Sequence, residues 1–299
     1  EGLHLPAGLG IVCRMTGTLL SLGHGYTAQA LARRLIPMGW RVIGTSRGRL
    51  ADLEAQGVEP HLWPGVALQP LLDQATHVLV SIAPDEAGDP VIAAEGAALR
   101  AARPAWVGYL STTGVYGDHA GGWVDEDTAL TPSTRRGQAR VRAEAEWQAL
   151  GLPLHIFRLA GIYGPGRGPF AKVRDGSARR IIKPGQVFSR THVEDIATVL
   201  EASIAQPRPG AIYNVCDDDP APPEDVIGHA AELLGLPLPP AVAWEEAEMS
   251  PMARSFYAES KRVLNDRIKA ELGVHLAYPT YREGLASLLA AERGTAGTG

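Results

Sequence analysis

The stretch TLLSLGHGYTAQALARRL, residues 18–35, joins two kinds of local pattern across a glycine turn. Its first five residues, Thr18–Leu22, form a short apolar run of the kind that fills a buried strand. Beyond Gly23 the apolar positions recur at helical spacing over residues 28–38, and Gly39 can cap the end of that helix. The stretch therefore predicts a buried strand, a tight turn and a helix.

Within this stretch, Gly23, Gly25 and Ala28 have the spacing G-x-G-x-x-A. Gly23 allows the tight turn, Gly25 lets the backbone approach a pyrophosphate at the helix N-terminus, and Ala28 allows close packing of the helix on the sheet. This context predicts a dinucleotide-binding turn, and Tyr26 and Thr27 at the start of the helix are expected to contact the cofactor. An ordinary strand-to-helix turn is the alternative, because glycine is common in such turns.

The next apolar run, WRVIGTS, predicts a second strand that ends at Ser46 and is followed by Arg47. A cofactor with a free ribose 2′-hydroxyl usually meets Asp or Glu at this point, about twenty residues past the glycines. Ser46 and Arg47 suit a 2′-phosphate instead, because a guanidinium forms charge-assisted hydrogen bonds to phosphate oxygens. The pair favours NADP over NAD, and a solvated loop arginine is the alternative.

Strand and helix patterns continue to alternate along the first half of the chain. Strands are predicted at 77–83, 105–111 and 154–160, and helices at 90–102 and 132–150. Such alternation is typical of an α/β fold with a doubly wound parallel sheet of the Rossmann type. Ala83 ends one of these strands, at the edge where such sheets bind ligands, and is expected to contact the cofactor.

The chain is interpreted as one core with a smaller lobe. Residues 15–164 are expected to form the nucleotide-binding core, and 190–216 to return to it. The looser pattern of 165–189 and 217–290 predicts a small C-terminal substrate lobe that closes over the carboxyl ends of the strands. Two end segments complete the division, an N-terminal extension at 1–14 and a frayed tail at 291–299.

The composition disfavours several classes of partner. The 299-residue chain has a formal net charge of −5 and no long basic run, which disfavours nucleic-acid binding, and no apolar run is long enough to span a bilayer. Cys13 and Cys216 form neither a disulfide framework nor a metal-ligand spacing, so no metal is expected and a reducing cytoplasm fits. The expected partner is a small-molecule substrate, and the alanine-rich helices at 90–102 and 132–150 suggest a homodimer.

Five short segments follow one another along the chain, namely GHGYTAQALA, YLSTTGVYGD, FRLAGIYGPGR, SRTHVEDIA and IYNVCDDDP. In this order and spacing they resemble the short-chain dehydrogenase/reductase superfamily in its extended, NAD(P)-dependent epimerase/dehydratase form. The resemblance covers residues 15–290, although the glycine turn is one residue shorter than the family's usual G-x-x-G-x-x-G. It implies a Rossmann-type fold and a nicotinamide dinucleotide cofactor.

The resemblance also places the family's catalytic positions on this chain. The catalytic hydroxyl falls on Thr112, with Tyr116 as the next candidate near it, whereas the family's Tyr-x-x-x-Lys pair falls on Arg136 and Arg140. The chain therefore resembles an atypical member that lacks this pair. Arginine stays protonated and cannot transfer a proton, but Arg140 can hold a ribose hydroxyl or phosphate of the cofactor. The alternative is that Arg140 pairs with Glu144 across one helical turn and that Arg136 is solvated.

Three functions are compatible with these residues. The first is an NADP-dependent oxidoreductase for a small molecule, because hydride transfer needs mainly a held cofactor and an oriented acceptor. The second is a non-catalytic NADP-binding sensor or regulatory protein, which the missing Tyr and Lys favour. The third, weaker, is a sugar-nucleotide epimerase or dehydratase, whose repeated proton transfers depend most on the missing Tyr.

Overall fold

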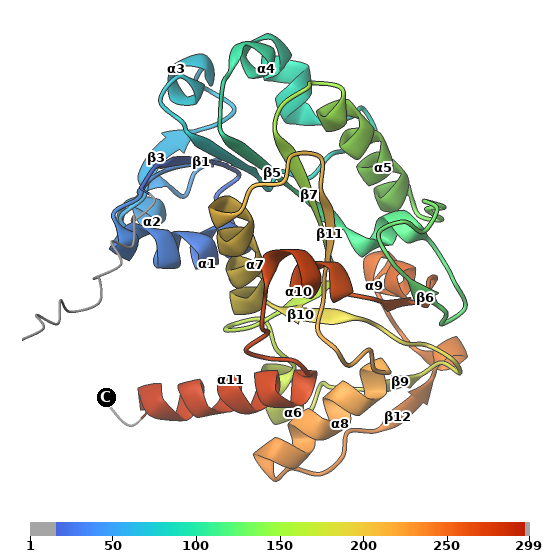
Figure 1. Cartoon of the computed structure of the whole chain (residues 1–299). Coiled ribbons are helices and arrows are strands. Elements are labelled where there is room, and N and C mark those ends of the chain that lie inside the picture. Colours follow the sequence, from blue (N-terminus) through green and yellow to red (C-terminus); the bar gives the residue numbers. More distant parts are fainter. Residues whose placement is uncertain (1–15, 297–299) are drawn as a thin grey trace, which may run out of the picture.

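The computed structural model describes residues 16–296, so the proposed extension at 1–14, with Cys13, and residues 297–299 of the proposed tail lie outside the described part. Its centre is a seven-stranded sheet with the order β11-β7-β5-β4-β1-β2-β3 (Figure 1). Every pair of neighbouring strands is parallel, and the strand order reverses between β1 and β4. The doubly wound α/β fold of the Rossmann type is thereby confirmed.

The elements have the following bounds. The strands of the sheet are β1 (Thr18–Leu22), β2 (Arg41–Ser46), β3 (Glu59–Leu62), β4 (His77–Val80), β5 (Trp106–Thr112), β7 (Leu154–Leu159) and β11 (Ile212–Val215). Short parallel pairs are β8 (Gly161–Tyr163) with β10 (Arg190–His192), β9 (Arg180–Ile182) with β12 (Ala241–Ala243), and β6 (Trp123–Val124) with β13 (Arg262–Val263). The helices are α1 (Tyr26–Leu35), α2 (Leu50–Glu54), α3 (Gln69–Leu72), α4 (Pro90–Ala101), α5 (Arg135–Gln148), α6 (Phe170–Arg174), α7 (Val193–Ala205), α8 (Pro223–Leu234), α9 (Pro251–Phe256), α10 (Asp266–Leu272) and α11 (Tyr281–Ala296), with 3₁₀ turns η1 (Ile36–Met38), η2 (Thr113–Tyr116) and η3 (Trp244–Glu246).

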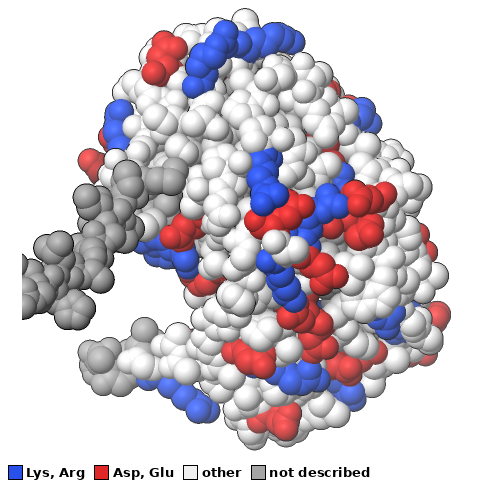
Figure 2. Space-filling view, viewed as in Figure 1, with Lys and Arg blue, Asp and Glu red and all other residues white. Residues whose placement is uncertain are grey.

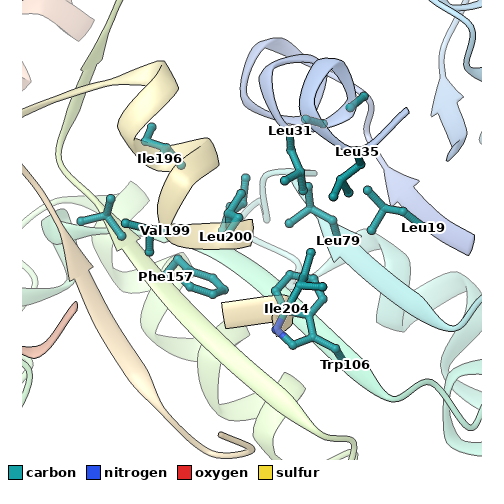
Figure 3. Close-up of a cluster of buried hydrophobic side chains, with 14 of the residues drawn as sticks. Leu19, Leu31, Leu35, Leu79, Trp106, Phe157, Ile196, Val199, Leu200 and Ile204 are labelled. Atoms are coloured by element: carbon teal, nitrogen blue, oxygen red, sulfur yellow. The ribbon is translucent and has the colours of Figure 1, made fainter. Parts of the chain in front are cut away.

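One face of the sheet is covered by α1 and α7. Leu31 and Leu35 of α1 and Leu200 of α7 pack against Leu19 of β1 and Phe157 of β7, and all five side chains are fully or almost fully buried (Figure 3). Apolar side chains at helical spacing supply the helix face, and the continuous apolar run of β1 supplies the strand. Burial of this cluster holds the N-terminal end of α1 at the carboxyl edge of the sheet.

The opposite face is covered by α4 and α5. Leu99 of α4 and Trp147 of α5 pack in a second buried cluster with Leu20 and Leu22 of β1. The predicted helix at 132–150 begins later than expected, because Thr134 is its N-cap and its Oγ1 accepts a hydrogen bond from the Gly137 N–H at 3.1 Å. The first two turns of α5 therefore carry Arg136 and Arg140.

A third cluster joins α6, α8 and α11 below the sheet, around Phe170 and Tyr281 (Figure 1). The helix α11 continues to Ala296, so the expectation of a frayed tail is wrong for residues 291–296. Burial of Leu288 and Leu289 in this cluster anchors the helix, and an ion pair between Arg174 and Glu292 ties its last turns to α6.

Part of the segment that was assigned to the lobe packs on the core instead. The strand β13 pairs with β6, and Ile268 and Leu272 of α10 belong to the same buried cluster as α1 and α7. We therefore assign 262–274 to the core, since their apolar side chains are buried against it. Among residues 16–296, no helix combines the length and the apolar character that crossing a membrane requires.

Candidate functional site

A cavity of about 1450 Å³ opens at the carboxyl ends of β1, β4, β5 and β7. Its wall runs from the glycine turn after β1, past the end of β5 and the first turns of α5, to the short helix α9. Ligand pockets usually measure about 300–1,000 Å³, so this cavity has room for a dinucleotide and a second small molecule. Its position at the reversal of strand order is where doubly wound sheets bind ligands.

The glycine turn has the shape that a close-approaching pyrophosphate needs. Gly23 has φ +81°, and a Cβ there would lie 2.7 Å from Cγ1 of Ile82, so a side chain is excluded for both reasons. Gly25 is exposed in the cavity wall, and the nearest atom to a Cβ at this position would be the Gly23 carbonyl oxygen at 3.8 Å. The free space beside Gly25 lies at the N-terminus of α1, where unpaired backbone N–H groups favour an anion.

Buried polar atoms without partners surround this turn. Among the described residues, Ser21 Oγ, Ser81 Oγ and both ring nitrogens of His24 are buried and make no hydrogen bond. Burial lowers the pKa of His24 to about 4, so its ring is neutral at physiological pH. Ser81 also lines the cavity. Such groups are costly unless a ligand satisfies them, and the hydroxyl and phosphate oxygens of a dinucleotide fit this requirement.

The helix start carries two of the predicted contact residues. Tyr26 and Thr27 both line the cavity, and the Tyr26 hydroxyl donates to the Pro165 carbonyl at 2.9 Å. The guanidinium of Arg167 lies 4.3 Å from the centre of the Tyr26 ring. Arg167 thus adds a cation beside the glycine turn that the sequence analysis missed, because it lies more than a hundred residues away along the chain.

The end of β2 lies beside the turn but outside the cavity wall. Thr45 accepts hydrogen bonds from the N–H groups of Gly23 (2.8 Å, to its Oγ1) and His24 (2.8 Å, to its carbonyl), and Ser46 and Arg47 follow directly. Arg47 is exposed and makes no ion pair within residues 16–296. Its guanidinium is therefore free for a ligand that extends past the turn.

Ala83 is not among the residues that line the cavity, and it is exposed to solvent. The predicted strand at 77–83 is shorter in the structure, because β4 ends at Val80 and the chain then leaves the sheet. Ser81, two residues earlier, occupies the cavity wall instead. The contact predicted for Ala83 stays a prediction, and Ser81 is a further candidate for a cofactor contact at the end of this strand.

Thr112 lies at the last position of β5 and lines the cavity. Its Oγ1 accepts a hydrogen bond from the Gly114 N–H at 3.2 Å, which caps the 3₁₀ turn η2. The hydroxyl proton has no acceptor among the described residues. It is available to a ligand oxygen in the cavity.

Tyr116 does not reach the cavity, so its interpretation as a catalytic candidate is corrected. The side chain is fully buried, its hydroxyl donates to Asn214 Oδ1 at 2.7 Å, and it accepts a hydrogen bond from Arg158 Nη1 at 3.0 Å. Burial raises the pKa of Tyr116 to about 12. The residue holds η2 against the core, which is a structural role.

The two arginines of α5 both line the cavity. Nη1 of Arg140 donates to the Leu110 carbonyl at 2.8 Å and to the Tyr109 hydroxyl at 2.9 Å, which fixes the guanidinium beside β5. Glu144 is not its partner, because Arg158 holds that carboxylate. The guanidinium of Arg136 lies 4.9 Å from the centre of the Phe256 ring. The alternative of an Arg140–Glu144 pair is therefore wrong.

A late segment of the chain completes the far end of the cavity. Glu259 and Lys261 line it and are buried, and Nζ of Lys261 donates to Glu259 Oε2 and to the Gly117 carbonyl, both at 2.7 Å. The Ser133 hydroxyl donates to Glu259 Oε1 at 2.6 Å. No sequence motif predicts this pair, because Lys261 meets the Gly117 carbonyl from a segment more than a hundred residues farther along the chain.

Comparisons with known proteins give four relatives of note, while no family model matches the chain. A conserved protein of unknown function from Silicibacter pomeroyi is 64% identical, with a TM-score of 0.88, over 92% of this chain and 99% of that one. A proposed NAD-dependent epimerase/dehydratase from Methylobacillus flagellatus is 26% identical, with a TM-score of 0.67, over 93% of this chain and 99% of that one.

Two curated proteins match over a shorter region. Protein YeeZ of Escherichia coli is 34% identical over 178 residues, which is 57% of this chain and 58% of that protein. A 3-diazoavenalumate denitrifying reductase of Streptomyces is 29% identical over 165 residues, which is 49% of this chain and 52% of that protein. The chain thus spans little more than half the length of the curated relatives that it matches.

Proposed function

Since the chain belongs to the extended short-chain dehydrogenase/reductase superfamily, beside the NAD(P)-dependent epimerases and dehydratases, we propose that it is an NADP-dependent oxidoreductase of a small-molecule substrate. One observation carries the proposal. A single cavity joins the open glycine turn at Gly25 to the Thr112 hydroxyl. The partial match to a curated reductase supports the same reaction class.

The residues that line the cavity would have distinct roles in binding the cofactor and orienting the substrate. Gly25 and the N-terminus of α1 would hold the pyrophosphate, and Ser81 would bond a cofactor oxygen. When bound, NADP(H) supplies the hydride chemistry. The Thr112 hydroxyl would donate to the carbonyl or imine acceptor of the substrate and orient it. The fixed guanidinium of Arg140 would donate a hydrogen bond to a ribose hydroxyl. It would not transfer a proton, because arginine stays protonated.

The preference for NADP over NAD rests on Arg47. Its guanidinium follows the Thr45–Ser46 end of β2, which is tied to the glycine turn, and it has no competing ion pair among the described residues. The nearby Arg49 is committed to Asp52 at 2.9 Å and offers a matched control. We expect Arg47→Ala to weaken NADP⁺ binding by about tenfold or more and to leave NAD⁺ binding unchanged. Calorimetry with both cofactors measures this, and an equal loss in Arg49→Ala would contradict it.

The reaction is tested with the unmodified protein, NADPH and a panel of aldehydes, ketones and imines, followed at the nicotinamide absorbance. We expect turnover with at least one member of the panel. Tight NADP⁺ binding without turnover of any of them would replace the oxidoreductase by the second candidate, a non-catalytic NADP-binding sensor. The observation that favours the sensor is that α5 presents Arg136 and Arg140 to the cavity, and neither transfers protons. For the same reason, these residues do not support a sugar-nucleotide epimerase or dehydratase.

A further inference from the structure

The charges that line the cavity differ from those of the molecule as a whole. The chain has a formal net charge of −5, and on the face seen in Figure 2 acidic and basic groups interleave around α10, where Arg267 pairs with Asp127 and Lys269 with Asp218. Among the described residues, one carboxylate and six cations line the cavity, namely Glu259 with Arg135, Arg136, Arg140, Arg167, Arg190 and Lys261. A wall of this kind favours anionic ligands.

The pyrophosphate of a dinucleotide would account for the cations near the glycine turn. Lys261 lies instead at the end of the cavity beside Gly117. Its ammonium contacts the Gly117 carbonyl beyond η2, and β5, which leads to this turn, is separated from β1 in the sheet by β4. Glu259 offsets the charge of Lys261, but Arg136, which also lines the cavity and makes no ion pair among the described residues, leaves net positive charge at this end. That charge favours a second anionic ligand.

The Lys261 ammonium has one donor left for that ligand. It carries three N–H groups, of which one is bonded to Gly117 and one to Glu259, and the described residues offer no acceptor for the third. Ser133 donates to one oxygen of Glu259 and Lys261 to the other, so both carboxylate oxygens are engaged. The carboxylate therefore holds the ammonium in place, and because Lys261 lines the cavity, its remaining N–H is available to a ligand there.

The segment around Lys261 is held rigidly against the core. The Ser260 N–H donates to Asp118 Oδ1 at 2.8 Å, and its hydroxyl donates to the Gly185 carbonyl at 2.9 Å. These bonds place the ammonium before any ligand arrives, which lowers the entropy cost of binding. A mobile surface lysine has no such preorganisation.

The same end of the cavity has an exposed apolar lip on α9. Met252 and Phe256 both line the cavity, and 62% and 49% of their surfaces remain exposed. The Arg136 guanidinium lies over the Phe256 ring, so this lip combines a flat apolar surface with positive charge. Such a surface fits a planar apolar ligand that carries an anionic group.

From these observations we propose that the substrate is a small planar carboxylate. Its carboxylate binds the free N–H of Lys261, and its ring or conjugated chain packs on Phe256 and Met252. The proposal names a substrate class for the oxidoreductase inferred above and rests on that function, but binding tests it separately from turnover.

The experiment compares two probes, trans-cinnamate and its neutral isostere trans-cinnamamide, by calorimetry on the full chain with and without saturating NADP⁺. We expect cinnamate to bind about tenfold or more tightly than cinnamamide, because a charge-assisted bond replaces a neutral one. In Lys261→Met this preference should vanish while NADP⁺ affinity is retained. The matched control Lys269→Met removes a surface lysine and should keep the preference.

If the unpaired Glu259 destabilises Lys261→Met, the double variant Glu259→Gln with Lys261→Met removes both charges together and should also lack the preference for cinnamate. Lys261→Arg keeps the positive charge and should keep that preference. Phe256→Ala should weaken both probes to the same extent. Equal binding of the two probes, binding of neither, or a preference that survives the loss of Lys261 would overturn the proposal. Lysine-dependent cinnamate binding without NADP⁺ binding would uphold the carboxylate site and refute the cofactor assignment instead.

Discussion

Arg158 and Glu144 form a buried, two-point ion pair, with Nη2–Oε2 at 2.8 Å and Nε–Oε1 at 3.2 Å, and both side chains are at most 4% exposed. The Ser111 hydroxyl also donates to Glu144 Oε1. This pair joins β7 to α5 and leaves Arg140, one turn earlier, without a carboxylate partner. Glu144 is therefore engaged by Arg158, and the Leu110 carbonyl and the Tyr109 hydroxyl hold Arg140 at the cavity wall.

Arg158→Met should destabilise the protein strongly, because it leaves the Glu144 carboxylate buried without its partner. We expect the free energy of unfolding to fall by about 3–5 kcal/mol in urea denaturation. The control is Arg33→Met, which breaks the partly exposed pair with Glu194 and should cost about 1 kcal/mol or less. Similar losses of unfolding free energy in the two variants would show that the buried ion pair stabilises the protein no more than an exposed one.

Gly25→Val should remove cofactor binding and leave the fold intact. The new side chain has open space on the protein side, so it projects into the volume beside the N-terminus of α1. NADP⁺ binding by calorimetry should be lost, while the thermal unfolding midpoint stays near that of the unchanged protein. Gly23→Val is the contrasting variant, since φ +81° and the close Ile82 side chain predict a clear loss of stability. Normal NADP⁺ binding by Gly25→Val would exclude the glycine turn as the pyrophosphate site.

Thr112→Val should lower kcat for any substrate found in the panel by about one to three orders of magnitude, because it removes a hydrogen bond to the reacting oxygen. Thr112→Ser keeps the hydroxyl and should retain most of the rate. The control is Thr198→Val on α7, whose hydroxyl donates to the Glu194 carbonyl at 3.0 Å and lies away from the cavity lining. Unchanged turnover in Thr112→Val would remove this residue from the reaction.

Asp217 should make the stability depend on pH near neutrality. Burial raises the pKa of this carboxyl group to about 8 against the partial opposition of Arg190, so the folded protein holds a proton that the unfolded chain has lost. Stability from this group is present at low pH and is lost as the pH rises to about 8, at about 1.4 kcal/mol per pH unit.

The measurement is urea denaturation at pH 7 and pH 8. His24, His77 and His192, whose pKa values burial lowers to about 4, are neutral in the folded protein and mostly neutral in the unfolded chain over this interval. Their small opposing slope is the same in the Asp217→Asn variant, which therefore isolates the contribution of Asp217. The unchanged protein should lose stability over this interval, and Asp217→Asn should lose much less. Parallel behaviour of the two proteins would contradict a protonated Asp217.

Much of the fold was predictable because local patterns encode it. The apolar run of β1, the glycine spacing and the amphipathic α1 together predict a strand–turn–helix unit, and their repetition predicts a parallel sheet. The end of α11 was not predictable in the same way. Polar and small residues at 291–296 predict coil, whereas burial of Leu288 and Leu289 earlier in the helix keeps this segment helical.

The sequence by itself determined the candidate residues of the glycine turn, because they follow a strand whose carboxyl end must lie at one edge of a parallel sheet. The position of Thr112 came from the resemblance to the extended short-chain dehydrogenase/reductase superfamily. Only the tertiary structure decided which polar groups remain available in the cavity. The Tyr116 hydroxyl is hydrogen-bonded to Asn214 and Arg158 and is therefore not available to a ligand. Lys261, in contrast, reaches the cavity from a segment far along the chain. Spacing along a chain specifies local geometry, but competition for hydrogen-bond partners is settled by contacts between distant segments.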